Sequence, residues 1–217
     1  VMRKSIESKR SYICGTLNLG ISINYAKYRL SDIISAYRTK YEQVTMHIVT
    51  DQSRQLYLKV LNGDIDIAII RGEYSWPGKK ILLDRESICA IYPPGSTEKE
   101  RENFTYIGRK TDSVFERELA QWLHENNIYA SPNGIQADSI STCVDLVNKK
   151  LGWAIVPEIC LHEFNGEIQP LFFENGEPFI RSTYLMYSET AEALPQVKVF
   201  IETIRDLQKK NYSTHTK

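Results

Sequence analysis

Apolar segments of strand length alternate with stretches of helical period along most of this chain, and this alternation constrains the fold more than any other feature. Residues 17–23 (LNLGISI) have a period of two, which predicts a strand. Apolar residues then recur at helical spacing from Leu30 to Tyr41, and residues 44–49 predict a second strand. A short helix ending near residues 62–63 and a third strand at 65–70 complete a βαβαβ order. This order predicts a mostly parallel sheet with helices on its faces.

A second series of similar elements follows two turn signals, at residues 76–78 (WPG) and 93–96 (PPGS). Residues 106–108, 133–136 and 152–156 predict strands, and helices alternate with them from Phe115 to Leu123 and from Ile140 to Leu151. Residues 183–187 predict a last strand, followed by an amphipathic helix over 194–207. The predicted fold is therefore α/β with two Rossmann-like lobes. In such folds ligands bind beyond the carboxyl ends of the strands, where helix N-termini offer unpaired N–H groups.

The charge balance argues against a nucleic-acid-binding surface on this chain. Its 217 residues include 27 Lys and Arg against 27 Asp and Glu, so there is no basic excess to replace counterions. With 42% hydrophobic and 25% charged residues, the composition is that of a folded globular protein. Cysteines at 14, 89, 143 and 160 form no CxxC pair, which predicts reduced thiols. We therefore expect no zinc module.

Motifs of catalysis and of export are not found in the sequence. The four histidines stand singly, and the phosphate-binding loops and the GxSxG elbow do not occur. No apolar run reaches 18 residues, and the first ten residues do not resemble a signal peptide. These observations predict a cytoplasmic protein that is not an enzyme and needs no metal or cofactor.

Four segments carry a resemblance to a known family. They are residues 15–21 (GTLNLGI), 37–44 (YRTKYEQV), 61–69 (LNGDIDIAI) and 146–157 (LVNKKLGWAIVP). In order and spacing they resemble the patterns G-x-L-x-(I/L)-G, (Y/F)-P-x-V, L-x-x-G-x-(L/I)-D-(L/I)-A-(I/L) and L-V-x-x-G-x-G-I-A-x-L-P of the effector-binding domain of LysR-type transcriptional regulators. The likeness runs from Gly15 to Leu207. Gln43 stands where the family has Pro, Lys150 replaces the first Gly of G-x-G, and residues 29–32 (RLSD) replace a Leu-Pro pair. We expect altered turns at these places within the same fold.

The resemblance implies the type 2 periplasmic-binding-protein fold, with two lobes joined by two crossover strands. On this basis residues 1–14 are the end of a linker helix, residues 15–88 and 185–210 form lobe I, and residues 89–184 form lobe II. Residues 211–217 are expected to be a disordered tail. The family places a winged helix-turn-helix upstream, so DNA would be a partner only of a chain that includes it. A small-molecule effector in the interlobe cleft and a homodimer or higher homo-oligomer are the other partners implied.

Two other functions are compatible with the same fold. A solute-binding protein of a transporter would use the same cleft without any link to DNA, but no signal peptide is found and the lead-in over residues 2–10 is basic. An enzyme is disfavoured because no acid–base pair or activated nucleophile stands out. The sensing domain is the leading hypothesis.

Candidate effector residues in lobe I follow its predicted strands. Ser22 and Asn24, in a predicted loop that includes Ile23 and precedes a helix, offer polar side chains beside free N–H groups, and a simple N-cap is the alternative for Asn24. Ser53, after Gln52, can cap the next helix, bind a ligand, or do both. Arg71 follows the third strand and can pair with a carboxylate, or it is a surface residue.

In lobe II the candidates again stand beside predicted helix starts. Ser113 and Glu116 have the spacing of a capping box, which makes capping the expected role of Ser113. If the family geometry holds, Thr111 and Asp112 face the cleft, and Asp112 would favour an effector with an amino or hydroxyl group. By likeness to the family, Ser139 and Pro157 line the pocket as well. The candidate effector residues are therefore Ser22, Ile23, Asn24, Gln52, Ser53, Arg71, Thr111, Asp112, Ser139 and Pro157.

Overall fold

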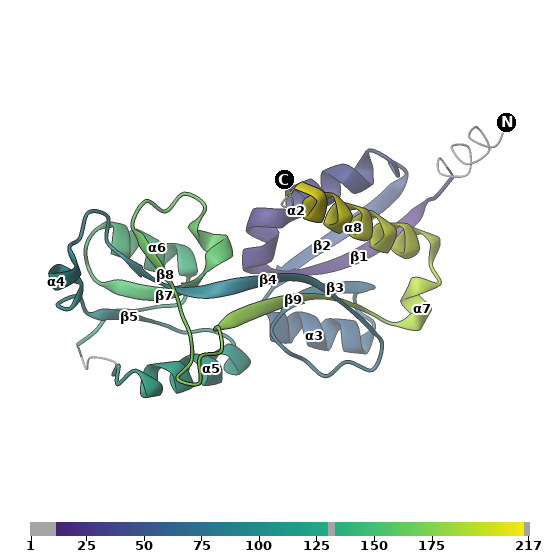
Figure 1. Cartoon of the computed structure of the whole chain (residues 1–217). Coiled ribbons are helices and arrows are strands. Elements are labelled where there is room, and N and C mark those ends of the chain that lie inside the picture. Colours follow the sequence, from purple (N-terminus) through teal and green to yellow (C-terminus); the bar gives the residue numbers. More distant parts are fainter. Residues whose placement is uncertain (1–11, 130–132, 215–217) are drawn as a thin grey trace. The chain divides into compact units, whose positions relative to one another are not determined.

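The computed structural model describes residues 12–129 and 133–214 (Figure 1). The chain divides into two compact units, of which unit 1 is Val1–Asp84 with Thr183–Lys217 and unit 2 is Arg85–Ser182. It passes from one unit to the other in β4 (Lys79–Tyr92) and again in β9 (Ile180–Tyr187). Of the expected linker helix, residues 1–11 lie outside the described residues. The predicted α/β fold with two crossing strands is confirmed.

Unit 1 contains the predicted βαβαβ order. Its elements are β1 (Gly15–Ser22), α2 (Ile23–Arg38), β2 (Val44–Asp51), α3 (Ser53–Asn62) and β3 (Ile67–Arg71), with α7 (Glu189–Glu192) and α8 (Pro195–Thr214) after β9. The strands lie in the order β2-β1-β3-β9, with β1 parallel to β2 and β3, and β9 antiparallel to β3. The carboxyl ends of β1, β2 and β3 therefore lie at one edge of the sheet.

Helices cover both faces of the unit 1 sheet. Figure 1 shows α2 and α8 on one face and α3 on the other. Tyr37 of α2 packs edge-on against Phe200 of α8, and its hydroxyl donates to the carbonyl of Gln196 at 2.9 Å. On the opposite face α3 lies close to β1. A Cβ at Gly20 would come within 2.9 Å of Leu56 of α3 and within 2.5 Å of Ile65, which follows that helix. A glycine at this position of β1 is therefore a packing requirement.

Unit 2 has a mixed sheet. Its elements are β4, α4 (Glu98–Arg101), β5 (Tyr106–Arg109), α5 (Ser113–Glu125), β6 (Gln136–Ala137), α6 (Ile140–Asn148), β7 (Trp153–Pro157), the 3-10 helix η1 (Glu158–Leu161) and β8 (Glu167–Pro170). β5 is parallel to β6 and β7, whereas β4 lies antiparallel between β7 and β8. The sequence did not predict β8 or the short helices, because four-residue elements carry too little periodicity.

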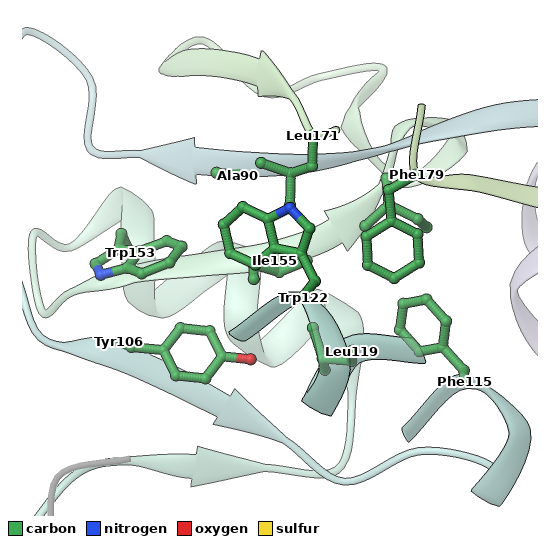
Figure 2. Close-up of a cluster of buried hydrophobic side chains, with 10 residues drawn as sticks. Ala90, Tyr106, Phe115, Leu119, Trp122, Trp153, Ile155, Leu171 and Phe179 are labelled. Atoms are coloured by element: carbon green, nitrogen blue, oxygen red, sulfur yellow. The ribbon is translucent and has the colours of Figure 1, made fainter. Parts of the chain in front are cut away.

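The core of unit 2 is rich in aromatic side chains (Figure 2). Trp122 of α5 and Trp153 of β7 are both buried. The Tyr106 ring lies 4.9 Å from that of Trp153, and the Phe115 and Phe179 rings are 5.7 Å apart. Packing of this kind holds the first turn of α5 and the end of β5 in fixed positions, and both carry polar residues discussed below.

Several predicted boundaries are corrected by the structure. Helix α2 begins at Ile23, seven positions before the first apolar residue of the predicted pattern at Leu30, so Ile23 and Asn24 are helical rather than part of a loop. Helix α6 ends at Asn148, and Leu151 is exposed instead of packed on its apolar face. Helix α8 is described as far as Thr214, whereas a disordered tail was expected from residue 211.

Lys150 occupies a backbone conformation that usually selects glycine. Its φ is 61°, and its N–H donates to the carbonyl of Val147 while that of Leu151 donates to Leu146. This is the hydrogen-bond pattern of a Schellman C-cap, in which the left-handed residue is most often Gly. The family's Gly at this position thus has a physical reason, and Lys150 retains the turn despite its side chain.

Candidate functional site

The polar edge of unit 1 is formed where β1 and β2 end and α2 and α3 begin. Ser22 ends β1 and pairs in register with Asp51, the last residue of β2. Neither α2 nor α3 has a side-chain hydrogen bond at its N-cap or an acidic residue in its first turn. The N–H groups and the positive dipole ends of two helices therefore meet this edge without a side-chain cap. The Asp51 carboxylate lies beside the start of α3, where it accepts from the N–H of Gln52. At the start of α2 the arrangement favours a negatively charged group.

Two buried hydroxyls in unit 1 have no hydrogen-bond partner within the described ranges. Ser22 is 4% exposed and Thr183 is 0% exposed. Thr183 lies on β9 directly opposite Arg71 of β3. Because buried hydroxyls in proteins are nearly always bonded, these two are candidate donors or acceptors for a ligand. The sequence pattern gave no signal for Thr183, which lies inside a predicted strand.

Ser53 and Arg71 are joined by a buried hydrogen bond. The backbone N–H of Arg71 donates to Oγ of Ser53 at 3.0 Å. Gln52, not Ser53, is the N-cap of α3, so the capping role considered for Ser53 is not observed. Arg71 is only 4% exposed, which excludes the alternative that it is a surface arginine. Ser53 therefore anchors the strand end that carries the Arg71 charge.

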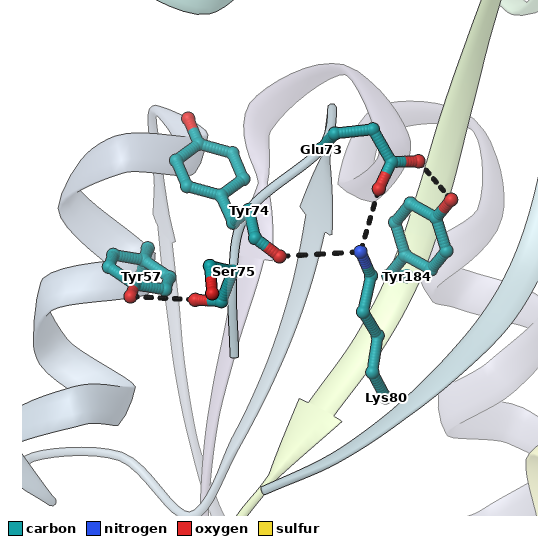
Figure 3. Close-up of polar contacts among 6 residues, drawn as sticks. All are labelled: Tyr57, Glu73, Tyr74, Ser75, Lys80 and Tyr184. Carbon is teal, nitrogen blue, oxygen red and sulfur yellow. Dashed lines mark hydrogen bonds and ion pairs between the residues drawn. The ribbon is translucent and has the colours of Figure 1, made fainter. Parts of the chain in front are cut away.

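The segment after Arg71 is anchored by a cluster of polar and aromatic side chains (Figure 3). Nζ of Lys80 donates to Glu73 at 2.7 Å and to the carbonyl of Tyr74 at 3.3 Å, and the hydroxyl of Tyr184 donates to Glu73. Lys80 also lies 3.9 Å from the centre of the Tyr184 ring, a cation–π distance. These contacts tie the segment to β4 and β9, which limits the movement of the β3 end.

Ile23, Asn24 and Gln52 have a lesser place in this geometry. Ile23 is the first residue of α2 and is 53% exposed, and Asn24 follows it inside the helix. The N-cap position considered for Asn24 belongs to Ser22. Gln52 is exposed, and its N–H donates to the Asp51 carboxylate at 2.8 Å. All three lie near the helix starts, and their contact with an effector stays a prediction.

Asp112 in unit 2 uses both carboxylate oxygens within the protein. Oδ1 accepts from the N–H of Phe115 at 3.1 Å, and Oδ2 pairs with Arg181 at 2.5 Å. Asp112 is thus the N-cap of α5, and the capping box expected of Ser113 is wrong because the helix begins one residue earlier than that box requires. Glu116 instead accepts from the N–H of Thr111 at 3.0 Å. The negative charge of Asp112 is committed to Arg181 rather than displayed toward a ligand.

Two guanidinium groups lie on the ring of Phe115. That of Arg181 is 4.5 Å from the ring centre and that of Arg109 is 5.4 Å from it. The pKa of Arg109 is lowered, mainly by burial. Cys143 opposes this shift, and the neighbouring Arg181 adds to it. Sequence reasoning missed both arginines, although Arg109 directly follows a predicted strand, as Arg71 does.

Ser139 and Pro157 lie at the starts of α6 and η1. Ser139 is the N-cap of α6, but its hydroxyl bonds to that of Ser141 at 2.7 Å and not to the helix backbone. Pro157 ends β7 and pairs in register with Ile88. Both stand beside helix starts, as the resemblance implies, and an effector contact for each stays a prediction.

No group of three or more metal-binding side chains was found among the residues that the structure describes. In that same part of the chain, no helix has the length and apolar character needed to cross a bilayer. Burial, with further contributions from Glu158 and Glu86, raises the pKa of Cys89 to about 12. At neutral pH Cys89 is therefore a thiol rather than a reactive thiolate.

Comparison with protein families identifies the domain. The model of the LysR substrate binding domain matches residues 10–209. This chain belongs to the LysR family. The LysR-type effector-binding domain that the sequence motifs indicated is thereby confirmed.

Relatives and solved structures agree with this LysR assignment. The chain is 30% identical over 195 residues to the HTH-type transcriptional regulator YraN of Bacillus subtilis (strain 168), covering 89% of this chain and 68% of YraN. Its fold is similar to a reduced form of OxyR from N. meningitidis, with a TM-score of 0.66 and 22% identity over 88% of this chain and 95% of that one. The effector binding domain of QuiR in complex with shikimate matches with a TM-score of 0.68 and 16% identity, over 91% and 98% of the two chains. The predicted type 2 periplasmic-binding-protein-like fold is confirmed.

Proposed function

We propose that this LysR-type domain senses a small-molecule effector and supports homodimerisation in a transcriptional regulator. The observation that carries the proposal is the polar edge of unit 1, where two uncapped helix N-termini meet a buried arginine and the unbonded hydroxyl of Ser22. A buried hydroxyl without a hydrogen-bond partner destabilises the folded protein, and a ligand that bonds to it would remove that cost. The shikimate complex of QuiR, a domain of similar fold, supports the same role.

The proposed mechanism is a shift between populations of states. As the family resemblance implies, the effector would be held between the two lobes, and its binding would favour one arrangement of lobes and subunits over another. A winged helix-turn-helix upstream would respond to that arrangement and change its binding to DNA. The effector is bound and released unchanged, so no catalytic group is required, and the regulator would act in the cytoplasm.

Thermal unfolding in the presence of a metabolite library tests the sensing role. A ligand at about 100 times its Kd stabilises the folded state by about 2.7 kcal/mol, which raises the melting temperature of a domain of this size by roughly 5–11 °C. Ser22→Ala should reduce the shift given by the active compound, whereas Ser31→Ala, at an exposed position of the same helix α2, should not. A library that leaves the melting temperature unchanged would count against an effector site.

The proposed homodimer is tested separately by sedimentation of the chain at rising concentrations. We expect a species of twice the monomer mass to dominate at high concentration. A single monomeric species at every concentration would remove dimerisation from the proposal without affecting the sensing role.

A further inference from the structure

Unit 2 contains a positive charge for which the described residues supply no counter-ion. Nε of Arg109 is buried and has no hydrogen-bond partner. The charged or titratable groups that influence Arg109 are Cys143, Arg181, Tyr106 and Cys160, none of them a carboxylate. The Arg109 side chain as a whole is partly buried. A partly buried guanidinium in this condition is unfavourable for a protein, since burying a charge is tolerated mainly when the charge is paired.

The neighbouring groups do not supply the missing negative charge. Burial raises the pKa of Tyr106 to about 12, so its hydroxyl is neutral at pH 7. Burial likewise raises the pKa of Cys143, although Arg109 opposes that shift, and Cys143 remains a thiol. The carboxylate of Asp112 is already bound to Arg181 and to the first turn of α5. Asp138, which follows the Ala137 paired with Arg109, acts on Cys143 and is not among the groups that act on Arg109. The positive end of the α5 dipole adds to the imbalance.

The placement of Arg109 is that of a binding residue. It is the last residue of β5, paired in register with Ala137 of β6, at the carboxyl end of two parallel strands. This end of a parallel sheet is where α/β folds bind their ligands. Arg71 has the equivalent place in unit 1, as the last residue of β3. The guanidinium lies 5.4 Å from the centre of the Phe115 ring, a cation–π distance, and its planar shape suits two-point binding of an oxyanion.

We propose that Arg109 is an anion-binding residue and that the effector of this domain carries a carboxylate or phosphate group that pairs with the Arg109 guanidinium. The inference rests on the sensing role proposed above and adds the charge class of the effector. It also assigns a specificity role to a residue that the sequence analysis did not select.

Acetate and inorganic phosphate are suitable probes, with chloride at matched ionic strength as the control for screening. The Nε–H signals of the arginines are followed by ¹⁵N–¹H NMR, and the Arg109 signal is identified by its disappearance in Arg109→Gln. A saturable shift of that signal with acetate or phosphate, and none with chloride, supports the proposal. The anion that binds with the lower Kd indicates whether the natural ligand carries a carboxylate or a phosphate. No saturable shift with either anion overturns the site.

Stability measurements separate a ligand-binding role from a structural one. Arg109→Gln should not lower the melting temperature of the unliganded protein, because it removes a partly buried charge that has no carboxylate partner. The same substitution should lower the affinity for the active library compound by at least about 10-fold, because it removes a charge-assisted hydrogen bond. Arg117→Gln, at an exposed position of α5, is the matched control and should change neither quantity.

The two proposals fail in different ways. A library compound that binds Arg109→Gln as tightly as the original protein would overturn the role of Arg109 and leave the sensing function supported. Anion binding at Arg109 without any stabilising library compound would support the anion site while weakening the sensing function. A large loss of stability in unliganded Arg109→Gln would show a structural role and overturn the inference.

Discussion

Asp112 pairs with Arg181 through one carboxylate oxygen at 2.5 Å while its other oxygen caps helix α5. Both side chains are almost fully buried, at 9% and 6% exposure. Asp112, which the family resemblance suggested for ligand recognition, is thus part of the structure that orients Arg181. The expectation of an effector with an amino or hydroxyl group relied on a free Asp112 carboxylate, whereas the inference above relies on the positive charge of Arg109.

Replacing Asp112 is expected to destabilise the protein strongly. Asp112→Asn retains a capping oxygen but removes the carboxylate that pairs with Arg181, and breaking a buried pair in this way costs about 3 kcal/mol. Denaturant unfolding measures the loss. Lys79→Gln, which removes the exposed pair with Glu189, should cost less than about 1 kcal/mol. Equal effects of the two substitutions would contradict the importance assigned to the buried pair.

Ser53→Ala and Ser22→Ala should differ in their effect on stability although both remove a buried hydroxyl. Without Ser53 the buried N–H of Arg71 loses its acceptor, which costs about 1–3 kcal/mol. The Ser22 hydroxyl has no hydrogen-bond partner in the described structure, so its loss should change the unfolding free energy by less than about 0.5 kcal/mol. Urea titration of the two variants checks the difference, and a greater loss for Ser22→Ala would show that its hydroxyl has a partner in the protein.

Lys150→Gly should stabilise the protein by roughly 0.5–1 kcal/mol. The gain comes from relieving a left-handed backbone, with a φ of 61°, that a side chain adopts unfavourably. Asn127 has a φ of 55° at the end of α5, but Asn tolerates this region better, so Asn127→Gly should gain less. A shift in the denaturant midpoint at constant slope is the readout. No gain at residue 150 would mean that the Lys side chain makes compensating contacts.

The Cys89 thiol should make the protein less stable at alkaline pH. Its pKa rises from an ordinary 9.0 to about 12 on folding, so between these values the unfolded chain loses a proton that the folded chain retains. The contribution of Cys89 to the unfolding free energy is therefore fully present below pH 9 and is lost as the pH rises toward 12. Cys89→Ala should flatten the fall by about 1.4 kcal/mol per pH unit. Cys14→Ala, at an exposed thiol, should leave the slope unchanged.

Much of the fold was predictable because its signals are local. The period-two pattern of β1 and the helical pattern of α3 each occupy a few consecutive residues, and both elements are found where they were expected. The start of α2 was not predictable from periodicity, since Ile23 at its first position is exposed while Tyr25 is buried. The short strand β8 was missed for another reason. It forms by pairing with β4, which is distant in sequence, and its own four residues carry no clear period.

The candidate site was predictable in position but not in chemistry. The rule that ligands bind at the carboxyl ends of parallel strands placed Ser22, Ser53 and Arg71 at one edge, and the structure brings these strand ends together. Thr183 joins them only through pairing of β9 with β3, more than 100 residues apart in sequence. No local pattern reports a contact of that kind.

The sequence by itself determined the family, the α/β architecture and the strand ends at which polar residues gather, because motif order and hydrophobic period are properties of neighbouring residues. Only the tertiary structure decided which charges are neutralised. Asp112 is bound by Arg181 from the far end of unit 2, whereas Arg109 receives no carboxylate, and both outcomes depend on long-range packing around Phe115. The free energy of a buried charge is set by whatever partners the fold brings within a few ångströms of it, and this information is not contained in any single segment.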